Sequence, residues 1–96
     1  MTTIINNINQ INNKEIKYKN GKYIGEFKND LRDGKGIFYC INGNRYEGDW
    51  KNNAKGGEGI TYFNNGDRRM GDFLNDKRIG KHVTLTINGE VKVNNY

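Results

Sequence analysis

Hydrophobic and polar residues alternate along several short segments of this chain. In the segment 23–27, which reads YIGEF, two aromatic residues and a central glycine occupy every second position. In the segment 46–50, YEGDW, the same positions are aromatic or glycine and the intervening ones are acidic. Residues two apart lie on the same face of a β-strand. The alternation therefore predicts strands with aromatic rings on one face and charged side chains on the other.

The pattern recurs at a fixed interval of 23 residues. Its most regular columns contain a glycine or an aromatic residue: Gly25, Gly48 and Gly71; Phe27, Trp50 and Phe73; Gly34, Gly57 and Gly80; Gly43, Gly66 and Gly89. Units 23–45 and 46–68 are regular, and residues 92–96 begin a further unit. The unit 69–91 is degenerate, because Arg69 replaces the first tyrosine and His82 replaces a glycine. Such a period indicates one supersecondary structure per copy.

Each unit predicts a pair of antiparallel strands. The segments 35–41, 58–63 and 81–87 form the second strands, and the asparagine, aspartate and glycine residues between segments are typical of turns. The chain has 13 glycines and no proline, which favours tight turns over helices. We therefore predict an all-β fold over residues 16–96, an elongated single-layer antiparallel meander of stacked hairpin repeats. Residues 1–15 are predicted to be disordered or a loose cap.

The conserved spacing also gives the first glycine of each unit a physical role. Gly25, Gly48 and Gly71 lie between aromatic positions on the same predicted face. A glycine leaves room for a close approach by a neighbouring chain segment. We expect an aromatic ring from an adjacent strand to lie over each of them.

Composition narrows the classes of function. The chain has 16 basic and 11 acidic side chains and a net charge of +5, which permits an anionic membrane, a nucleic acid or an acidic protein as a partner. Its single cysteine, Cys40, excludes an internal disulfide bond. The sequence has no hydrophobic run near the ~18 residues of a membrane span and no signal-peptide pattern. We expect a cytoplasmic protein, with peripheral membrane contact as an alternative.

The residues that could support catalysis are too far apart in the predicted sheet. Cys40 and His82 would lie four strands apart, roughly 19 Å at ~4.8 Å per strand, whereas a nucleophile and its base need hydrogen-bond contact. The segment 56–59, GGEG, lacks the helix start and the lysine of a phosphate loop. The segment 29–40 has leucine and cysteine where a calcium loop needs ligands. We expect no enzyme activity, catalytic residue, cofactor or metal site.

The phrase Y-x-G-x-W/F, followed by G-x-G, a tyrosine and a glycine turn at a period of 23, resembles the MORN (membrane occupation and recognition nexus) repeat. The resemblance extends from Tyr23 to Tyr96. It implies an elongated, twisted single-layer sheet with an aromatic-lined groove. Members of this family generally act as interaction platforms for proteins, and some are reported to bind acidic phospholipids.

The candidate site is a set of aromatic residues predicted to share one face: Tyr23, Phe27, Tyr39, Tyr46, Trp50, Tyr62 and Phe73. These rings hold the repeats together, and a single-layer sheet has no second layer to cover them. Part of each ring should therefore stay accessible, and exposed aromatic grooves are typical of binding sites. We expect a helix or an extended segment of a partner protein to dock there.

Basic residues form two further columns, and they leave an alternative open. One column contains Arg32, Lys55 and Arg78, and the other contains Lys22, Arg45 and Arg68. They serve solubility and edge protection, or they attract acidic phospholipid headgroups at about 1 kcal/mol per residue. Nucleic acid is a weaker candidate, since acidic residues are interleaved with the basic ones. The last strand, 90–96, has no following strand in the sequence, and we expect it to pair with a partner strand or with its own copy in a homodimer.

Overall fold

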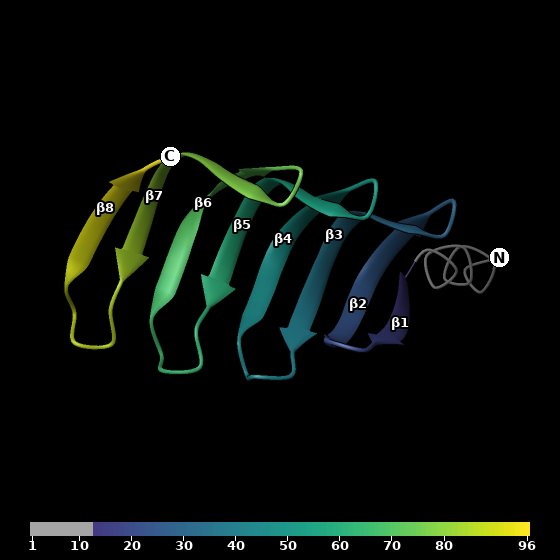
Figure 1. Cartoon of the computed structure of the whole chain (residues 1–96), viewed down its shortest axis with the longest axis horizontal. Coiled ribbons are helices and arrows are strands. Elements are labelled where there is room, and N and C mark those ends of the chain that lie inside the picture. Colours follow the sequence, from purple (N-terminus) through teal and green to yellow (C-terminus); the bar gives the residue numbers. More distant parts are fainter. Residues whose placement is uncertain (1–12) are drawn as a thin grey trace, which may run out of the picture.

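The computed structural model describes residues 13–96, which form one open sheet of eight antiparallel strands in chain order (Figure 1). The strands are β1 (Asn13–Tyr18), β2 (Gly21–Lys28), β3 (Leu31–Cys40), β4 (Arg45–Lys51), β5 (Ala54–Tyr62), β6 (Arg68–Leu74), β7 (Lys77–Leu85) and β8 (Val91–Asn95). The described residues contain no helix. The predicted all-β meander is confirmed, and the sheet measures 49 × 29 × 24 Å.

The two ends of the sheet carry different turns. At one end, β2 and β3 are joined by Asn29 and Asp30, which both have positive φ angles of 52° and 64°. A two-residue turn with two positive φ angles is the type I′ hairpin turn, which suits the twist of paired strands and favours asparagine and aspartate. The pairs Asn52–Asn53 and Asn75–Asp76 repeat it. At the other end, longer loops contain the glycine column that begins with Gly43.

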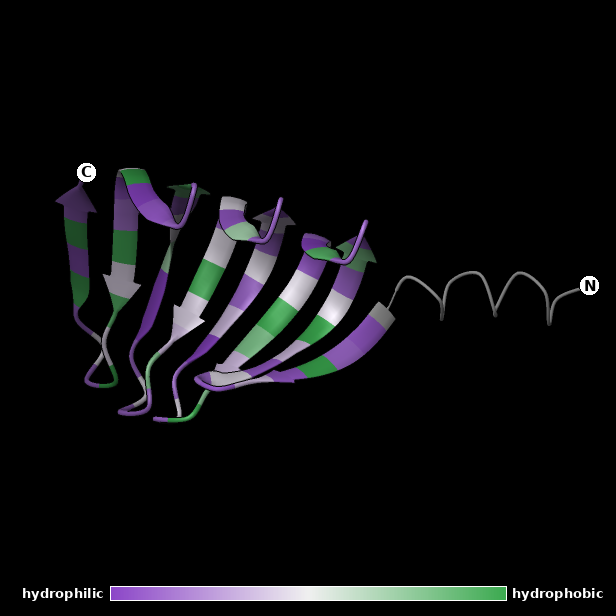
Figure 2. Ribbon diagram, turned by 45° about the vertical axis from the view of Figure 1, so that its right-hand side comes forward, coloured by the Kyte–Doolittle hydropathy of each residue, from purple (hydrophilic) through white to green (hydrophobic). Residues whose placement is uncertain are grey.

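Beside each type I′ turn, the register of the hairpin shifts. Gly25 pairs with Gly36, but Phe27 pairs with Arg32, so that two steps along β2 correspond to four along β3. Gly34 lies in this irregular segment with a φ angle of 102°, which a residue with a side chain rarely adopts. Shifts of this kind bend a strand and increase its twist. The hairpin ends accordingly turn out of the plane of the sheet (Figures 1 and 2).

The sheet has one well-packed face, which we call the inner face. Its core consists of five aromatic side chains that are at most 7% exposed: Tyr23, Phe38, Tyr46, Trp50 and Phe73. Thr61 and His82 are buried beside them. Hydrophobic and hydrophilic residues follow one another along the strands, because successive residues belong to opposite faces (Figure 2). The burial needed for folding therefore comes mostly from aromatic rings on a single face.

A row of glycines crosses the sheet under the tyrosine rings. Gly25, Gly36, Gly48, Gly59 and Gly71 are successive partners across strands β2 to β6. The Tyr23 ring lies against Gly36, where a Cβ atom would be 2.1 Å from the tyrosine oxygen, and the Tyr46 ring lies against Gly59 in the same way. The two rings need these glycines, because a side chain at either position would overlap them.

The expected role of the first glycine in each unit is correct for only one of the three. A Cβ atom on Gly25 or Gly48 would first meet the backbone of the neighbouring strand, at 2.5 Å and 2.4 Å. A Cβ atom on Gly71 would meet the ring of His82, which extends from the adjacent strand β7. Gly25 and Gly48 thus permit close contact between strands. The Tyr23 and Tyr46 rings lie mainly over the cross-strand partners of these glycines, Gly36 on β3 and Gly59 on β5.

The expectation of a disordered segment or loose cap at residues 1–15 falls mostly on residues 1–12, which lie outside the described residues. Residues 13–15 belong to β1, which pairs with β2 from Asn13 to Tyr18. The sheet therefore starts three residues before the predicted boundary.

Candidate functional site: the aromatic groove

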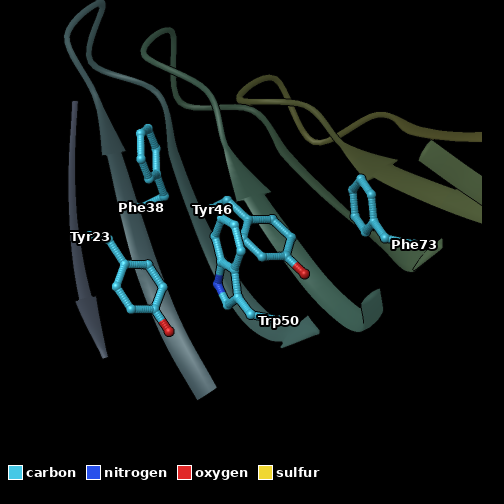
Figure 3. Close-up of a cluster of buried hydrophobic side chains, with 5 residues drawn as sticks. All are labelled: Tyr23, Phe38, Tyr46, Trp50 and Phe73. Atoms are coloured by element: carbon cyan, nitrogen blue, oxygen red, sulfur yellow. The ribbon is translucent and has the colours of Figure 1, made fainter. Parts of the chain in front are cut away.

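The inner face carries a continuous series of rings in edge-to-face contact. The order of the series is Phe27, Tyr23, Trp50, Tyr46, Phe73, His82 and Tyr96. Successive ring centroids are 5.0–5.4 Å apart, and the planes cross at 81–86°. Figure 3 shows the central rings projecting from one side of the sheet. Edge-to-face pairs of this geometry stabilise proteins beyond the area that they bury.

The hydroxyl groups of two rings also bind the backbone beside the register shifts. Tyr23 donates to the carbonyl of Glu26 at 2.8 Å, and Tyr46 donates to the carbonyl of Asp49 at 3.0 Å. Burial raises the pKa of Tyr23 to about 12, with a smaller contribution from the nearby Glu26 carboxylate. Burial likewise raises the pKa of Tyr46, well above its ordinary value. Both phenols therefore stay neutral and act as hydrogen-bond donors within the fold.

Two of the predicted aromatic residues do not lie on this face. Tyr39 follows the buried Phe38, and Tyr62 follows the buried Thr61, so both point to the outer face. The reason is the two-residue type I′ turn, which places each odd-numbered residue of β2 opposite an even-numbered residue of β3, as Tyr23 lies opposite Phe38. The residues that point to the inner face are therefore odd-numbered in β2 and even-numbered in β3. The placement of Tyr39 and Tyr62 in the groove was wrong, and Phe38 was missed.

The expectation that part of each ring stays accessible is also wrong for the central rings. Tyr23 is fully buried, Tyr46 is 2% exposed and Trp50 is 5% exposed. Basic side chains lie over them. The guanidinium group of Arg32 lies 4.7 Å from the Trp50 ring centre, and the amine of Lys55 lies 4.8 Å from that of Tyr46. Cation–π contacts of this kind cover the rings that a single sheet layer would leave open.

The first predicted basic column is thus part of the same site as the rings. Arg32, Lys55 and Arg78 are the cross-strand partners of Phe27, Trp50 and Phe73, and directly opposite residues share a face. Arg78 extends the series, with its guanidinium group 4.7 Å from the Tyr96 ring centre. The sequence already indicated that these cations share a face with the rings, because a two-residue turn at 29–30 places residue 27 opposite residue 32.

Neighbouring hairpins hold two of these cations in place. The Arg32 guanidinium group donates to the side-chain oxygen of Asn53 at 2.7 Å and to its carbonyl at 2.9 Å. One unit further, the backbone N–H of Lys55 donates to an Asp76 carboxylate oxygen at 2.8 Å. Burial lowers the pKa of the Lys55 amine, and the Asp76 carboxylate opposes that shift. The cations are therefore ordered parts of the face.

The rings and cations line two adjacent hollows. The larger hollow has a volume of about 530 Å³ and includes Tyr46, Phe73 and Tyr96 in its lining. The smaller has a volume of about 260 Å³ and includes Phe38 and Trp50. Cys40, Lys55 and Asp76 line both hollows and lie where the two meet. We call the two hollows together the aromatic groove.

The second predicted basic column lies on the outer face. Lys22, Tyr39, Arg45, Tyr62 and Arg68 are successive cross-strand partners, so cations and tyrosines alternate in one row. The Arg45 guanidinium group lies 4.1 Å from the Tyr62 ring centre and donates to Glu47 at 2.6 Å, a hydrogen bond that raises the pKa of Arg45. The two basic columns therefore face opposite directions.

The third unit replaces a tyrosine ring with a histidine ring. Arg69 stands where Tyr23 and Tyr46 stand, and His82 stands where the glycines under those rings stand. The His82 side chain, 1% exposed, occupies the vacant ring position and contacts Phe73 on one side and Tyr96 on the other. Its Nε2 atom lies 2.9 Å from the carbonyl of Asp72, which corresponds to Glu26 and Asp49. The loss of a tyrosine ring at Arg69 is thus compensated by the gain of a ring at His82.

The described residues do not assemble a recognisable catalytic or metal site. Cys40 is half-buried on β3, whereas His82 is buried on β7, four strands away. No three histidine, cysteine, aspartate or glutamate side chains within residues 13–96 come together as metal ligands would. This part of the chain also has no helix long and apolar enough to cross a membrane.

An open, one-layer meander of stacked hairpins, with one ring-lined face, defines a β-hairpin repeat protein. The model of the MORN repeat matches residues 23–45 and 46–68, the two regular units. These two units are therefore MORN repeats, and the family suggests a binding or interaction module that is generally non-enzymatic. No curated protein matches the sequence.

Proposed function

We propose that this protein is a non-catalytic interaction module whose aromatic groove docks a segment of a partner protein. The observation that carries the proposal is the pair of adjacent hollows on the inner face, which are lined by rings and cations from successive units. A partner helix or extended segment laid along it would contact several units at once. Grooves with an apolar floor and ordered polar groups at their rim suit such segments.

Each unit offers the partner a similar local surface. Arg32, Lys55 and Arg78 each lie over or beside an aromatic ring, and successive members are two strands, or about 10 Å, apart. The exposed ring of Tyr96 and the half-buried Cys40 add apolar contact area. Because the most buried rings are covered by cations, a partner would meet charged and apolar groups together.

A second candidate function is peripheral attachment to acidic phospholipid. The same three cations favour it, since none of them is in an ion pair with a described residue. The other basic column works against it, because Lys22, Arg45 and Arg68 face away from the groove. A flat membrane could therefore engage only one of the two columns, at about 1 kcal/mol per residue.

Two binding experiments separate these candidates. The full chain is used to select binders from a library of random linear peptides, and it is also sedimented with phosphatidylserine vesicles at low and high salt. Groove docking predicts that peptides are enriched over the empty support and that sedimentation does not depend on the lipid. Absence of enriched peptides, together with salt-sensitive sedimentation that Arg32→Glu, Lys55→Glu and Arg78→Glu abolish, would favour the lipid function instead.

A further inference from the structure

The larger hollow of the aromatic groove is lined by five basic residues: Arg45, Lys55, Arg69, Lys77 and Arg78. Lys55 lies over Tyr46 and Phe73 at 4.8 and 5.4 Å, and Arg69 lies 5.0 Å from the Phe63 ring centre. Arg78 lines the same hollow. Arg69 is free to point there because the His82 ring fills the space that a tyrosine ring occupies in the other units. This exchange adds a guanidinium group to the groove where the first two units have a phenol.

Lys55, Arg69 and Arg78 are in no ion pair with a described residue. The ion pairs among residues 13–96 join Lys22 to Glu15, Lys35 to Asp49, Arg45 to Glu47 and Lys51 to Asp33, so that Arg45 is the ion-paired cation of this hollow. Asp76 is the single carboxylate among the described residues that line it, and one of its oxygens already accepts the Lys55 backbone N–H. The hollow therefore has an excess of positive charge.

The Arg69 side chain is the least satisfied of the three. Its Nε atom is buried and has no hydrogen-bond partner among the described residues. Burial lowers the pKa of Arg69, and the nearby charge of Arg78 lowers it further. A buried donor without an acceptor is costly, and so are like charges in contact. An anion placed between these groups would relieve both costs.

We propose that this hollow is a carboxylate-binding subsite of the aromatic groove, which receives an aspartate or glutamate side chain of an acidic partner peptide. The proposal rests on the proposed function and adds the chemical class of the partner. The guanidinium groups of Arg69 and Arg78 both line the hollow, and a guanidinium group matches a carboxylate, because its N–H donors form parallel hydrogen bonds to the two oxygens. The exposed ring of Tyr96, which lines the same hollow, takes an apolar residue beside the acidic one.

The depth of the subsite favours a peptide over a flat surface. Arg69 is half-buried and lines the hollow, so a bilayer or a nucleic-acid duplex lying flat over the groove has poor access to its guanidinium group. A single acidic side chain that enters the hollow has better access. The charge imbalance of the hollow supplies the complementarity, which mainly determines which partner is chosen and how fast it binds.

The test uses the peptides selected by the full chain from a random linear library. Asp and Glu should be enriched in them relative to the starting library. The Kd of the most enriched peptide is then measured by fluorescence anisotropy for the wild type, Arg69→Gln and Arg78→Gln. We expect each substitution to weaken binding about tenfold or more. Replacing the acidic residues of the peptide with Asn and Gln should weaken it similarly.

Arg68→Gln is the matched control. Arg68 precedes Arg69 on the same strand but belongs to the outer-face row, so the substitution removes the same charge without touching the hollow. Its Kd should stay within about twofold of the wild type, since its charge is distant and screened. Arg69→Lys, which keeps the charge and loses the planar donor group, should give an intermediate Kd. Thermal unfolding of each variant establishes that it is folded.

Two results would overturn the subsite. One is an enriched peptide set that is neutral or basic, and the other is an acidic peptide whose Kd is unchanged by Arg69→Gln and Arg78→Gln. In either case peptide docking on the groove would still stand. If the library yields no peptide at all, both the subsite and the proposed function are wrong. If the chain sediments with phosphatidylserine vesicles and Arg69→Gln abolishes this sedimentation, the ligand of the subsite is a lipid and not a peptide.

Discussion

At the scale of single residues, each tyrosine of the inner face joins two neighbouring strands. The Tyr23 ring lies over Gly36, its hydroxyl group binds the carbonyl of Glu26, and its edges contact Phe27 and Trp50. A ring with so many contacts fixes both the register shift and the spacing of the units. The same side chains that stabilise the sheet thus set the shape of the groove.

Trp50 should be the most important ring for stability. It contacts Tyr23, Tyr46 and Phe38, and its indole N–H donates to the carbonyl of Gly36 at 3.2 Å. We expect Trp50→Ala to lower the free energy of unfolding by about 3–5 kcal/mol. Phe73→Ala should cost less, because Phe73 lies in the degenerate unit and makes no hydrogen bond through its ring. Denaturant midpoints of the two variants measure the difference, and an equal or larger loss for Phe73→Ala would contradict it.

The buried tyrosines should make the protein sensitive to alkali. The pKa of Tyr23 is raised to about 12 in the folded chain, from an ordinary 10.0. The unfolded chain therefore loses the phenol proton first as the pH rises, and the stability that Tyr23 contributes is complete below pH 10 and lost between pH 10 and about 12. We expect this loss to be about 3 kcal/mol, because each pKa unit corresponds to about 1.4 kcal/mol.

Denaturant unfolding across that pH range measures the effect. Tyr23→Phe should cost about 1 kcal/mol near neutral pH, through the lost hydrogen bond, and should make the decline in alkali shallower. Tyr39→Phe, on the exposed outer face, serves as the control and should keep the wild-type decline. A decline that is the same in all three proteins would show that other groups cause it.

At the scale of elements, the hairpin is the unit that the sequence predicts best. Alternation and the period of 23 residues predicted the strands and their order, because both depend on local pattern. The face on which a residue lies depended on turn geometry as well. Tyr39 and Tyr62 were misplaced because the parity change at the type I′ turn was not applied. The ring position of His82 depends on packing against Phe73 and Tyr96, which the pattern of its own strand does not specify.

The exchange of residues in the third hairpin should appear as energetic coupling. Arg69→Tyr alone should destabilise the sheet, because a tyrosine ring there would overlap the side chain of His82, as a Cβ on Gly59 would overlap Tyr46. His82→Gly alone should cost about 2–4 kcal/mol, because it empties a buried position and removes the contact with the Asp72 carbonyl.

The double substitution restores the arrangement of the first two units. We expect its cost to be smaller than the sum of the single costs by about 2 kcal/mol, since residues in contact are not additive. Urea unfolding of the four proteins measures this coupling. Costs that add to within about 0.5 kcal/mol would show that the two positions do not compensate each other.

At the scale of the whole molecule, each hairpin contacts its neighbours, and residues 13–96 form a single layer. The ring series and the cations connect all the units along the inner face. Arg32, Lys55, Arg69 and Arg78 on the inner face are in no ion pair with a described residue, whereas Lys22, Arg45 and Lys51 form ion pairs. This asymmetry was not visible in the net charge, because it depends on which face each residue occupies. The proposal that partners bind the inner face rests partly on it.

The single cysteine allows the central claim, that partners bind in the aromatic groove, to be tested directly. Cys40 lines both hollows, so a bound segment covers its thiol. The measurement is the rate at which a thiol reagent alkylates Cys40 in the full chain, with and without a saturating amount of a selected peptide. As a control, Cys40→Ser with Glu58→Cys moves the thiol to the exposed outer face. We predict that the peptide slows alkylation of Cys40 at least about tenfold and leaves the outer-face thiol unaffected; protection of the outer-face thiol, with Cys40 reacting at its free rate, would contradict groove binding.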